Sequence, residues 1–384
     1  MTQKKKVVGV VFGGRSPEHE ISLRSAVFIL NNIPSQFNIL PIGIKKDGSW
    51  VSTTTVKNKS SFEKATVKDL EKFLKKETSV IASKTSIRDA CCLPVPVNAI
   101  PKSSKFLKIL NLDVDVFFPV LHGVNGEDGT IQSLFELAEL PYVGNSVRSS
   151  VLGIDKDFQK RLVAQDGVRI ANYRGLEYQE WNKDQSKMID HIIKEVGFPC
   201  FVKPNAQGSA VGTGPAETRA QLMQRINEAF KFDQRVLVEE SLKGGEFECA
   251  FIGNFIDGFI TRPGEIAPTG FYSYEEKYSS TSTSQVFIPA RLEQNQMDEL
   301  IESCRVIARS LRLDGLCRID FLKDPVKQEF VFNEINTIPG MTSISLYPKA
   351  MESEKISHAK WIKQAITDGI NRNKLQRKRI TSLG

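Results

Sequence analysis

The chain has 384 residues, which is too long for one ordinary domain and predicts two or three. Hydrophobic residues make up 40% of the sequence and charged residues 25%, a globular composition that argues against a disordered, fibrous or collagen-like chain. The formal net charge is +7, and this basic balance raises the question of a nucleic-acid or membrane partner.

The N-terminal segment has the pattern of a parallel α/β sheet. Lys6–Phe12 is rich in apolar residues, as in a buried strand. A helix is predicted next, with Ser16 as N-cap, Pro17 in the first helical position and an end near Asn31. Asn38–Ile44 is predicted as the second strand. The order strand, helix, strand indicates an α/β fold.

Residues 45–108 interrupt this pattern. They are rich in Lys, Ser and Thr, carry a short helical pattern near residues 67–76, and are interpreted as a surface insertion in the first domain. Val114–Leu121 is predicted as the next buried strand, and residues 126–140 as a loop and a helix.

Two further units follow from about Ser149. Helices are predicted at Asp155–Ala164, Thr218–Phe230 and residues 295–311. Strands are predicted at Gly197–Lys203, Val236–Glu240, Glu248–Ile252, Asp257–Thr261, Gly315–Leu322 and Phe330–Asn336. A glycine-rich loop spans Gly208–Gly214 and a polar loop spans residues 270–285.

Two of these strand segments indicate a metal site. Arg318-Ile-Asp320 places polar side chains at i and i+2, on one face of a strand. Glu334-Ile-Asn336 repeats the arrangement at a spacing that suits a hairpin. The pairing would bring Asp320, Glu334 and Asn336 together, and their oxygen atoms suit Mg²⁺ when phosphate completes its shell. Amphipathic strands with solvated outer faces are the alternative.

Two loops could bind anions. The loop at residues 208–214 lacks both common phosphate fingerprints, but its backbone N–H groups could bind phosphate. Lys156 and Lys203, each at the start or end of a regular element, are the other candidates for phosphate contacts. Residues 333–345 join a polar strand to Pro339-Gly340 and a Ser/Thr-rich turn, which could bind a small carboxylate. Plain turns and solvated lysines are the alternatives.

Taken together, the motifs resemble the D-alanine–D-alanine ligase family of the ATP-grasp superfamily. The resemblance covers nearly the whole chain, in the family's order, outside residues 45–108 and the C-terminal tail. The matching segments are GGRSPEHEISLRSA (13–26), LHGVNGEDGTIQSLFELAELPYVGN (121–145), DK (155–156), FVKPNAQGSAVG (201–212), FYSYEEKY (271–278), CRIDF (317–321) and NEINTIPGMTSISLYPK (333–349).

The resemblance implies a three-domain α/β architecture of the ATP-grasp type. Its parts would be an N-terminal parallel α/β (pre-ATP-grasp) domain at 1–147 with the insertion at about 45–108, a central lid domain at 148–238 and a catalytic domain at 239–384. It implies ATP and two Mg²⁺ or Mn²⁺ as cofactors and D-alanine as substrate. A homodimer is also expected.

The resemblance also implies a nucleotide and metal site. Lys156, Lys203 and the loop at Gly208 would bind ATP phosphates, and Lys277 would contact the γ-phosphate. Glu239 and Glu246 would bind the adenosine. Asp320, Glu334 and Asn336 would hold the metal ions.

A substrate site is implied in the same way. Glu18 would hold the amino group of the first D-alanine, in a hydrogen-bond network with Ser209 and Tyr278. His122 would lie near the substrates, and Ser345 and Leu346 would line the second D-alanine site. Arg318 and the N–H group of Gly340 would stabilise the anionic tetrahedral intermediate of the ligation.

The implied reaction passes through an acyl phosphate. ATP would phosphorylate the carboxylate of one D-alanine, and the amine of the second would displace phosphate to give D-alanyl-D-alanine for peptidoglycan precursors. Tyr278 favours this dipeptide over a D-lactate ester. The glycine loop departs from the family pattern, because Ala210 lacks a hydroxyl and a later lysine is missing.

Two other functions remain as alternatives. One is an ATP-grasp ligase that joins a different carboxylate and amine, because the predicted ATP and metal residues fit it equally well. The other is a basic nucleic-acid-binding protein. The positive charge, however, is concentrated in residues 45–108 (net +8) and 351–384 (net +5), and the remainder, which holds every candidate site residue, carries −6. We therefore expect no nucleic-acid partner.

The location expected for this chain is the cytoplasm, with no membrane partner. Val7–Phe12, the longest apolar run near the start, is far shorter than the roughly 20 residues of a membrane helix, and the start lacks a secretory signal pattern. None of the six cysteines has C-x-x-C spacing, which indicates reduced, buried thiols.

Overall fold

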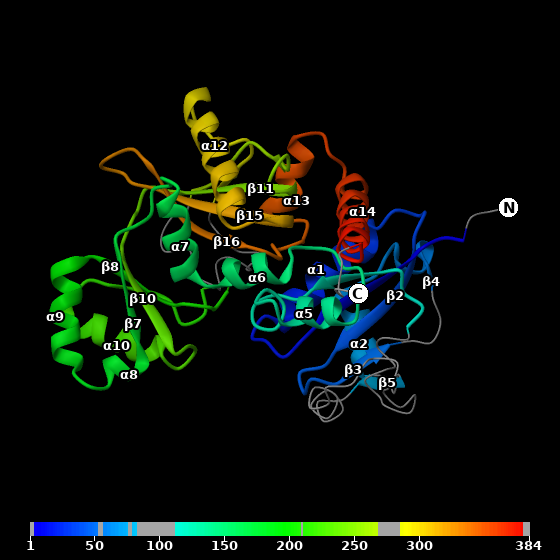
Figure 1. Cartoon of the computed structure of the whole chain (residues 1–384), viewed down its shortest axis with the longest axis horizontal. Helices are drawn as coiled ribbons and strands as arrows, with labels where there is room; N and C mark the ends of the chain where they lie inside the picture. The colour runs from blue at the N-terminus through cyan, green and yellow to red at the C-terminus, as the bar shows by residue number, and fades with distance from the viewer. Residues whose placement is uncertain are drawn as a thin grey trace, which may run out of the picture. The chain divides into compact units, whose positions relative to one another are not determined.

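The structure is a computed structural model that describes residues 4–52, 57–75, 79–82, 112–208, 210–267 and 285–378 (Figure 1). The chain divides into two compact units. Unit 1 comprises residues 1–147, 314–316 and 338–384, and unit 2 comprises residues 148–313 and 317–337. The finer division into 1–147, 148–238 and 239–384 stays a prediction. Within the described residues, no helix combines the length and the apolar character needed to cross a membrane.

Unit 1 is built on one sheet with strand order β5-β3-β2-β1-β6, and β4 pairs with β2. β1 runs parallel to both β2 and β6, which confirms the predicted parallel α/β start. The strands are β1 Val7–Gly13, β2 Asn38–Ile44, β3 Trp50–Ser52, β4 Lys57–Asn58, β5 Ser79–Ala82 and β6 Val116–Val120. The helices are α1 His19–Asn32, η1 Lys59–Phe62, α2 Val67–Lys75, α5 Thr130–Leu137, α13 Leu346–Ser353 and α14 His358–Gln376.

Helix α1 begins later than the sequence predicts. Ser16 is not its N-cap, because the Ser16 hydroxyl accepts a hydrogen bond from the backbone N–H of Glu18 (3.0 Å) and the helix begins at His19. The Ser-Pro-acid pattern is a local signal, and here the same hydroxyl stabilises a turn that precedes the helix. As a result Glu18 lies just outside α1, with its side chain buried.

The parallel pairing of β1 and β6 positions two candidate site residues. Because the two strands are neighbours and run in the same direction, the loops after them leave the sheet at the same edge. Glu18 follows β1 and His122 follows β6. Unit 1 therefore brings them to one edge although 104 residues separate them in sequence.

Unit 2 contains two sheets. The first has the order β7-β10-β8-β9 and is antiparallel throughout; the second has the order β14-β13-β11-β15-β16, with β12 on β11. The strands are β7 Tyr173–Glu177, β8 Cys200–Pro204, β9 Gly214–Ala216, β10 Arg235–Glu240, β11 Glu246–Asn254, β12 Phe259–Ile260, β13 Gly264–Ala267, β14 Gln285–Phe287, β15 Asp314–Lys323 (which begins in unit 1) and β16 Phe330–Asn336. The helices are α6 Val147–Ile154, α7 Lys156–Gln165, α8 Tyr178–Trp181, α9 Gln185–Glu195, α10 Arg219–Ala229 and α12 Gln294–Ser310.

Local sequence signals predict several of these elements well. The carboxylate of Asp155 accepts from Phe158 N at the start of α7, and the hydroxyl of Thr218 accepts from Gln221 N at the start of α10. Two strands are shorter than predicted. β8 begins only at Cys200, after Pro199, which has no N–H to donate to a sheet, and β12 is confined to Phe259–Ile260.

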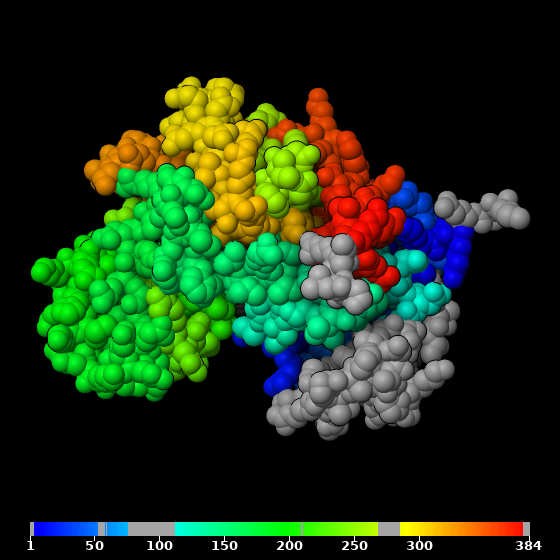
Figure 2. Space-filling view, viewed as in Figure 1, coloured from blue at the N-terminus to red at the C-terminus, as the bar shows by residue number. Residues whose placement is uncertain are grey.

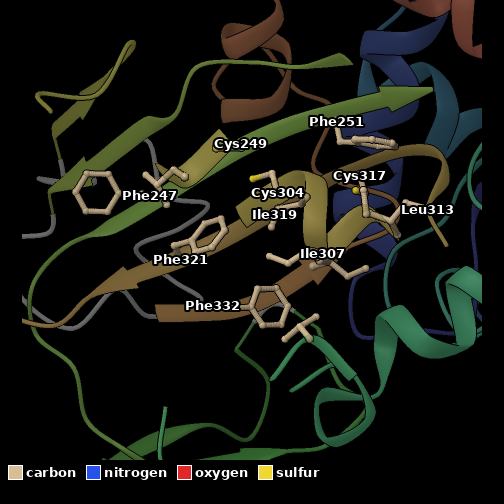
Figure 3. Packing of buried hydrophobic residues seen from close by; sticks show 14 of the residues in the cluster. Phe247, Cys249, Phe251, Cys304, Ile307, Leu313, Cys317, Ile319, Phe321 and Phe332 are labelled. Atoms are coloured by element: carbon tan, nitrogen blue, oxygen red, sulfur yellow. The ribbon is translucent and has the colours of Figure 1, made fainter. Parts of the chain in front are cut away.

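Unit 2 has one hydrophobic cluster on its first sheet, under α9 and α10, and another between its second sheet and α12. Side chains of β11, β15 and β16 meet the apolar face of α12, with Cys304 and Ile307 buried among aromatic rings (Figure 3). The opposite face of α12 is polar and exposed. Figure 2 shows this segment, in yellow, on the surface of the molecule. This amphipathic packing holds β15 and β16, which carry the candidate metal ligands.

We predict that the buried thiols of unit 2 resist chemical modification. Cys200, Cys249, Cys304 and Cys317 are free and buried. Burial raises the pKa of Cys200 to about 11 and the pKa of Cys304 and Cys317 well above the usual thiol value, so little thiolate forms. With Cys91 and Cys92 replaced by Ser, Ellman's reagent should titrate no thiol in the native protein at mildly alkaline pH and all four after denaturation. Fast reaction of any thiol before unfolding would contradict the packing described.

Candidate active site

The carboxylate of Glu18 lies against the loop that follows β6. Gly123 in this loop has a positive φ of 69°, and a Cβ atom at Gly123 would lie 2.2 Å from Glu18 Oε2 and 3.2 Å from Ser16 Oγ. Only glycine allows this close approach. Unit 1 thus brings Glu18 next to Gly123, the residue that follows His122.

His122 is buried and links three segments of unit 1. Its Nδ1 atom lies 2.9 Å from the carbonyl oxygen of Ile338, and its Nε2 atom lies 2.9 Å from Ser25 Oγ. A carbonyl can only accept, so Nδ1 carries the proton, and in the neutral ring Nε2 accepts from the Ser25 hydroxyl. Ser25 Oγ in turn accepts from the N–H of Met341 (3.3 Å). Ser25 was not predicted as a site residue.

Glu127 holds the other side of the same residue, Ile338. Its Oε1 atom accepts from the N–H of Ile338 and its Oε2 atom from the N–H of Gly123, each at 2.9 Å. The loop that begins at Ile338 is therefore held by His122 through the carbonyl and by Glu127 through the N–H. The sequence placed Glu127 in a matching motif without a role, because its partner lies 211 residues away.

The loop held in this way carries Gly340 toward Ser345. A Cβ atom at Gly340 would lie 3.0 Å from Ser345 Oγ, so the two predicted residues are neighbours. Ser345 Oγ lies 2.7 Å from Thr342 Oγ1 and accepts from the N–H of Thr342 (3.1 Å). Ser345 precedes α13, and Leu346 is the buried first residue of that helix.

In unit 2, three lysines surround two carboxylates. Lys203 Nζ donates to Glu239 Oε2 and Asn333 Oδ1, each at 2.8 Å, and Lys160 Nζ lies 3.2 Å from Glu239 Oε1. Lys156 Nζ lies 3.2 Å from Glu334 Oε2 and donates to the carbonyl of Gln207 (2.7 Å), beside the glycine loop. We call these five charged residues the lysine cluster; its formal charge is +1. Lys160 was not predicted, because a single lysine in a helix normally indicates a solvated face.

Burial and pairing act in opposite directions on this cluster. Burial alone would raise the pKa of Glu239, but the ammonium groups of Lys160 and Lys203 outweigh it and lower that pKa, so the carboxylate is ionised. Burial lowers the pKa of Lys160 despite the opposing effect of Glu239. Because one oxygen of Glu239 faces each lysine, the carboxylate is held in one orientation.

A second cluster surrounds Arg318. Its Nε atom lies 2.7 Å from Asp320 Oδ1 and 2.9 Å from Glu248 Oε2, and Nη2 lies 2.6 Å from Asp320 Oδ2. Burial by itself would lower the pKa of Arg318, but Asp320 and Glu248 outweigh it and raise that pKa well above its usual value. Glu248 was not predicted as a site residue; its place beside Glu246, at i and i+2 on β11, was the available signal.

The predicted hairpin places the candidate metal ligands as the spacing implies. In the antiparallel pairing of β15 with β16, Asp320 stands opposite Glu334 and Arg318 opposite Asn336. Asn336 Nδ2 donates to Asp320 Oδ2 (2.9 Å). Oxygen atoms of Glu246, Glu248 and Asp320 also lie within 4.8 Å of one another. The atoms that could bind a metal ion here, carboxylate oxygens and the amide oxygen of Asn336, are all hard oxygen ligands. The residues present therefore fit a Mg²⁺ or Mn²⁺ site.

The remaining predicted residues have different outcomes. Gly208 accepts a hydrogen bond from the N–H of Val211 (3.1 Å) in a turn of the glycine loop. Ser209, Lys277 and Tyr278 lie outside the described residues.

Comparisons with known proteins show the family of this chain. The family models described as D-ala D-ala ligase N-terminus and C-terminus match residues 7–145 and 162–367. The chain belongs to the D-alanine–D-alanine ligase family. Its similar relatives include the D-alanine–D-alanine ligases of Caldicellulosiruptor bescii (38% identical, 97% of each chain covered) and Oceanobacillus iheyensis (39%, 96% of each).

Two solved structures are also similar to this chain. The D-alanine-D-alanine ligase from Coxiella burnetii is 28% identical, with a TM-score of 0.79 over 98% of this chain and 97% of the other. The VanG D-Ala:D-Ser ligase from Enterococcus faecalis is 31% identical, with a TM-score of 0.76 over 95% and 100%. The resemblance stated from the motifs is thereby confirmed, as is the α/β fold.

We predict that Glu127→Gln loosens the loop at Ile338. Glutamine keeps one acceptor oxygen but points an NH₂ group at the second N–H, which costs about 1–3 kcal/mol for an unsatisfied buried group. Hydrogen exchange at Ile338 and Gly123 should accelerate, and the melting temperature should fall. Glu71→Gln, on the exposed face of α2, serves as the control and should change neither. Unaltered protection of both amides in Glu127→Gln would argue against this clamp.

Proposed function

We propose that this chain joins two D-alanine molecules with ATP, giving D-alanyl-D-alanine, ADP and phosphate. The observation that carries the proposal is the opposite charge of the two buried clusters in unit 2. The lysine cluster has a formal charge of +1. The cluster around Arg318 is negative, because one guanidinium faces two carboxylates, those of Asp320 and Glu248. Polyphosphate and a divalent cation are the pair of ligands that would complete both clusters.

In this proposal Lys156, Lys203 and Glu239 of the lysine cluster contact the nucleotide. Lys156 and Lys203 would bind phosphate oxygens, together with the glycine loop at Gly208 and Lys277. Glu239 and Glu246 would bind the adenosine. Asp320, Glu334 and Asn336 would hold two Mg²⁺ or Mn²⁺, which when bound neutralise the charge of the phosphates.

The substrate residues of unit 1 and Arg318 would position the reacting groups. Glu18 would accept hydrogen bonds from the ammonium group of the first D-alanine, with Ser209 and Tyr278 in its network. Arg318 and the Gly340 N–H group would stabilise negative charge on the carbonyl oxygen under attack, where one donor is typically worth about 2.7–4 kcal/mol. His122 would fix the loop beside it, and Ser345 and Leu346 would line the second D-alanine site. Lys277 and Tyr278 would exclude water, which hydrolyses an acyl phosphate.

A second substrate range is favoured by one observation. The solved D-Ala:D-Ser ligase is about as similar to this chain (31% identical) as the solved D-alanine-D-alanine ligase from Coxiella burnetii (28%), so D-serine could replace the second D-alanine. An ATP-grasp ligase with other substrates is the broader alternative.

We also propose that the chain forms a homodimer, which light scattering would test, and that it is located in the cytoplasm, which cell fractionation would test.

The function is tested by ATP-dependent phosphate release. Four reactions are compared in parallel, and the product of each is identified by mass spectrometry. Three contain D-alanine, L-alanine or D-lactate as the sole substrate, and the fourth contains D-serine together with D-alanine. We expect D-alanine to give the fastest release and D-alanyl-D-alanine as product. Phosphate release with L-alanine but not with D-alanine would contradict the proposal. Faster phosphate release with D-serine plus D-alanine than with D-alanine as the sole substrate would make D-serine the second substrate.

A further prediction concerns the close contact of Gly123 with Glu18. The Cβ atom of Gly123→Ala would displace the Glu18 carboxylate, so KM for D-alanine should rise about tenfold or more while KM for ATP changes little. Gly144→Ala is a matched control: Gly144 also has a positive φ (102°), but a Cβ atom there meets nothing within 4 Å. Equal effects of the two substitutions would attribute the loss to backbone strain and not to Glu18.

A further inference from the structure

Lys160 is the most deeply buried charged residue of the lysine cluster, and nothing in the proposed reaction uses it. Its side chain is 0% exposed, compared with 10% for Lys203 and 7% for Lys156. An ammonium group without water costs several kcal/mol unless it is paired. Within the described residues, its Nζ atom lies 3.2 Å from Glu239 Oε1 and 3.3 Å from the carbonyl oxygen of Asn333.

The position of Lys160 on α7 explains this burial. Lys156 and Lys160 are at positions i and i+4, so they lie on one face of the helix. Gln159, on the adjoining part of that face, accepts from the N–H of Ile335 on β16 (3.1 Å). The face thus packs on β16, and Lys160 points into the interior.

Glu239 is shared unequally between its two lysines. Lys203 makes the shorter contact, 2.8 Å against 3.2 Å, and is the more exposed of the two. Without Lys160, Glu239 and Lys203 would form a neutral pair. With Lys160 present the three residues carry +1, and the nearby pair of Lys156 and Glu334 adds no net charge. The positive surplus therefore exists because Lys160 is there.

We propose that Lys160 is a positioning residue that neutralises Glu239, which leaves the charge of Lys203 available for the phosphates of a nucleotide. This inference rests on the proposed function and adds a residue to it. When a phosphate draws Lys203 away, Glu239 keeps a cationic partner in Lys160. A buried, unpaired carboxylate, which would oppose nucleotide binding, is thus avoided.

The test measures the affinity of the full-length protein for ADP and for adenosine with Mg²⁺ present, by competition against a fluorescent nucleotide. Lys160→Met removes the charge and keeps the length of the side chain. We expect the ratio of the adenosine Kd to the ADP Kd to fall about tenfold or more, because Lys203 is then held by Glu239 and binds the phosphates less well. An effect on the adenosine through Glu239 acts on both ligands and cancels in this ratio. Lys160→Arg should restore most of the ADP affinity.

A double variant separates electrostatics from structure. In Lys160→Met with Glu239→Gln, Lys203 again carries an uncompensated charge, so the ratio of adenosine Kd to ADP Kd should recover toward the wild-type ratio. A merely structural role of Lys160 predicts a further loss instead. Arg169→Met is the matched control, because Arg169 is a cation of unit 2 paired with two carboxylates, Asp324 and Glu329. It should leave both affinities unchanged.

Other outcomes overturn the inference. Unchanged ADP affinity in folded Lys160→Met, or equal weakening of ADP and adenosine, would exclude the positioning role while the proposed function stands. A wild-type protein that binds no ADP would overturn the proposed function as well. Should Lys160→Met fail to fold, Lys160→Gln, which keeps an amide donor for Glu239 and Asn333, is measured against the same expectations.

Discussion

The carboxylate of Glu239, shared between Lys160 and Lys203, is the interaction on which unit 2 depends. It joins α7, the first sheet through β8 and β10, and the second sheet through Asn333 on β16. All of these groups are buried or nearly so, and a buried charge is tolerated only while it is paired. Removing Glu239 would take the carboxylate partner from both lysines, so the geometry of the lysines is tied to the packing of both sheets.

The two units hold their candidate site residues by different means. Unit 2 uses ion pairs in two clusters, one with excess positive charge around Glu239 and one with excess negative charge around Arg318. Unit 1 uses hydrogen bonds to the backbone on both sides of one residue, with His122 at the carbonyl and Glu127 at the N–H of Ile338. The first arrangement suits charged ligands that compete for a partner. The second suits a loop whose backbone N–H group must stay in place.

Local patterns predicted much of this chain because their physical causes are local. The alternation of polar and apolar residues in Arg318–Asp320 and Glu334–Asn336 was enough to predict a hairpin, and the caps Asp155 and Thr218 marked the starts of α7 and α10. The same kind of evidence failed at Ser16, where one hydroxyl could cap a helix or close a turn. In the structure the hydroxyl closes the turn, and the local pattern alone does not report which of the two it does.

The sequence by itself determined the α/β class, the order of most elements, the family resemblance and the residue types available for anion and metal binding. Only the tertiary structure decided which charged side chains are buried and which residues form their ion pairs and hydrogen bonds. Lys160 lies beside the carbonyl of a residue 173 positions away, and His122 contacts one 216 positions away. Propensity and periodicity act over a few residues, whereas the cost of burying a charge depends on every segment that surrounds it.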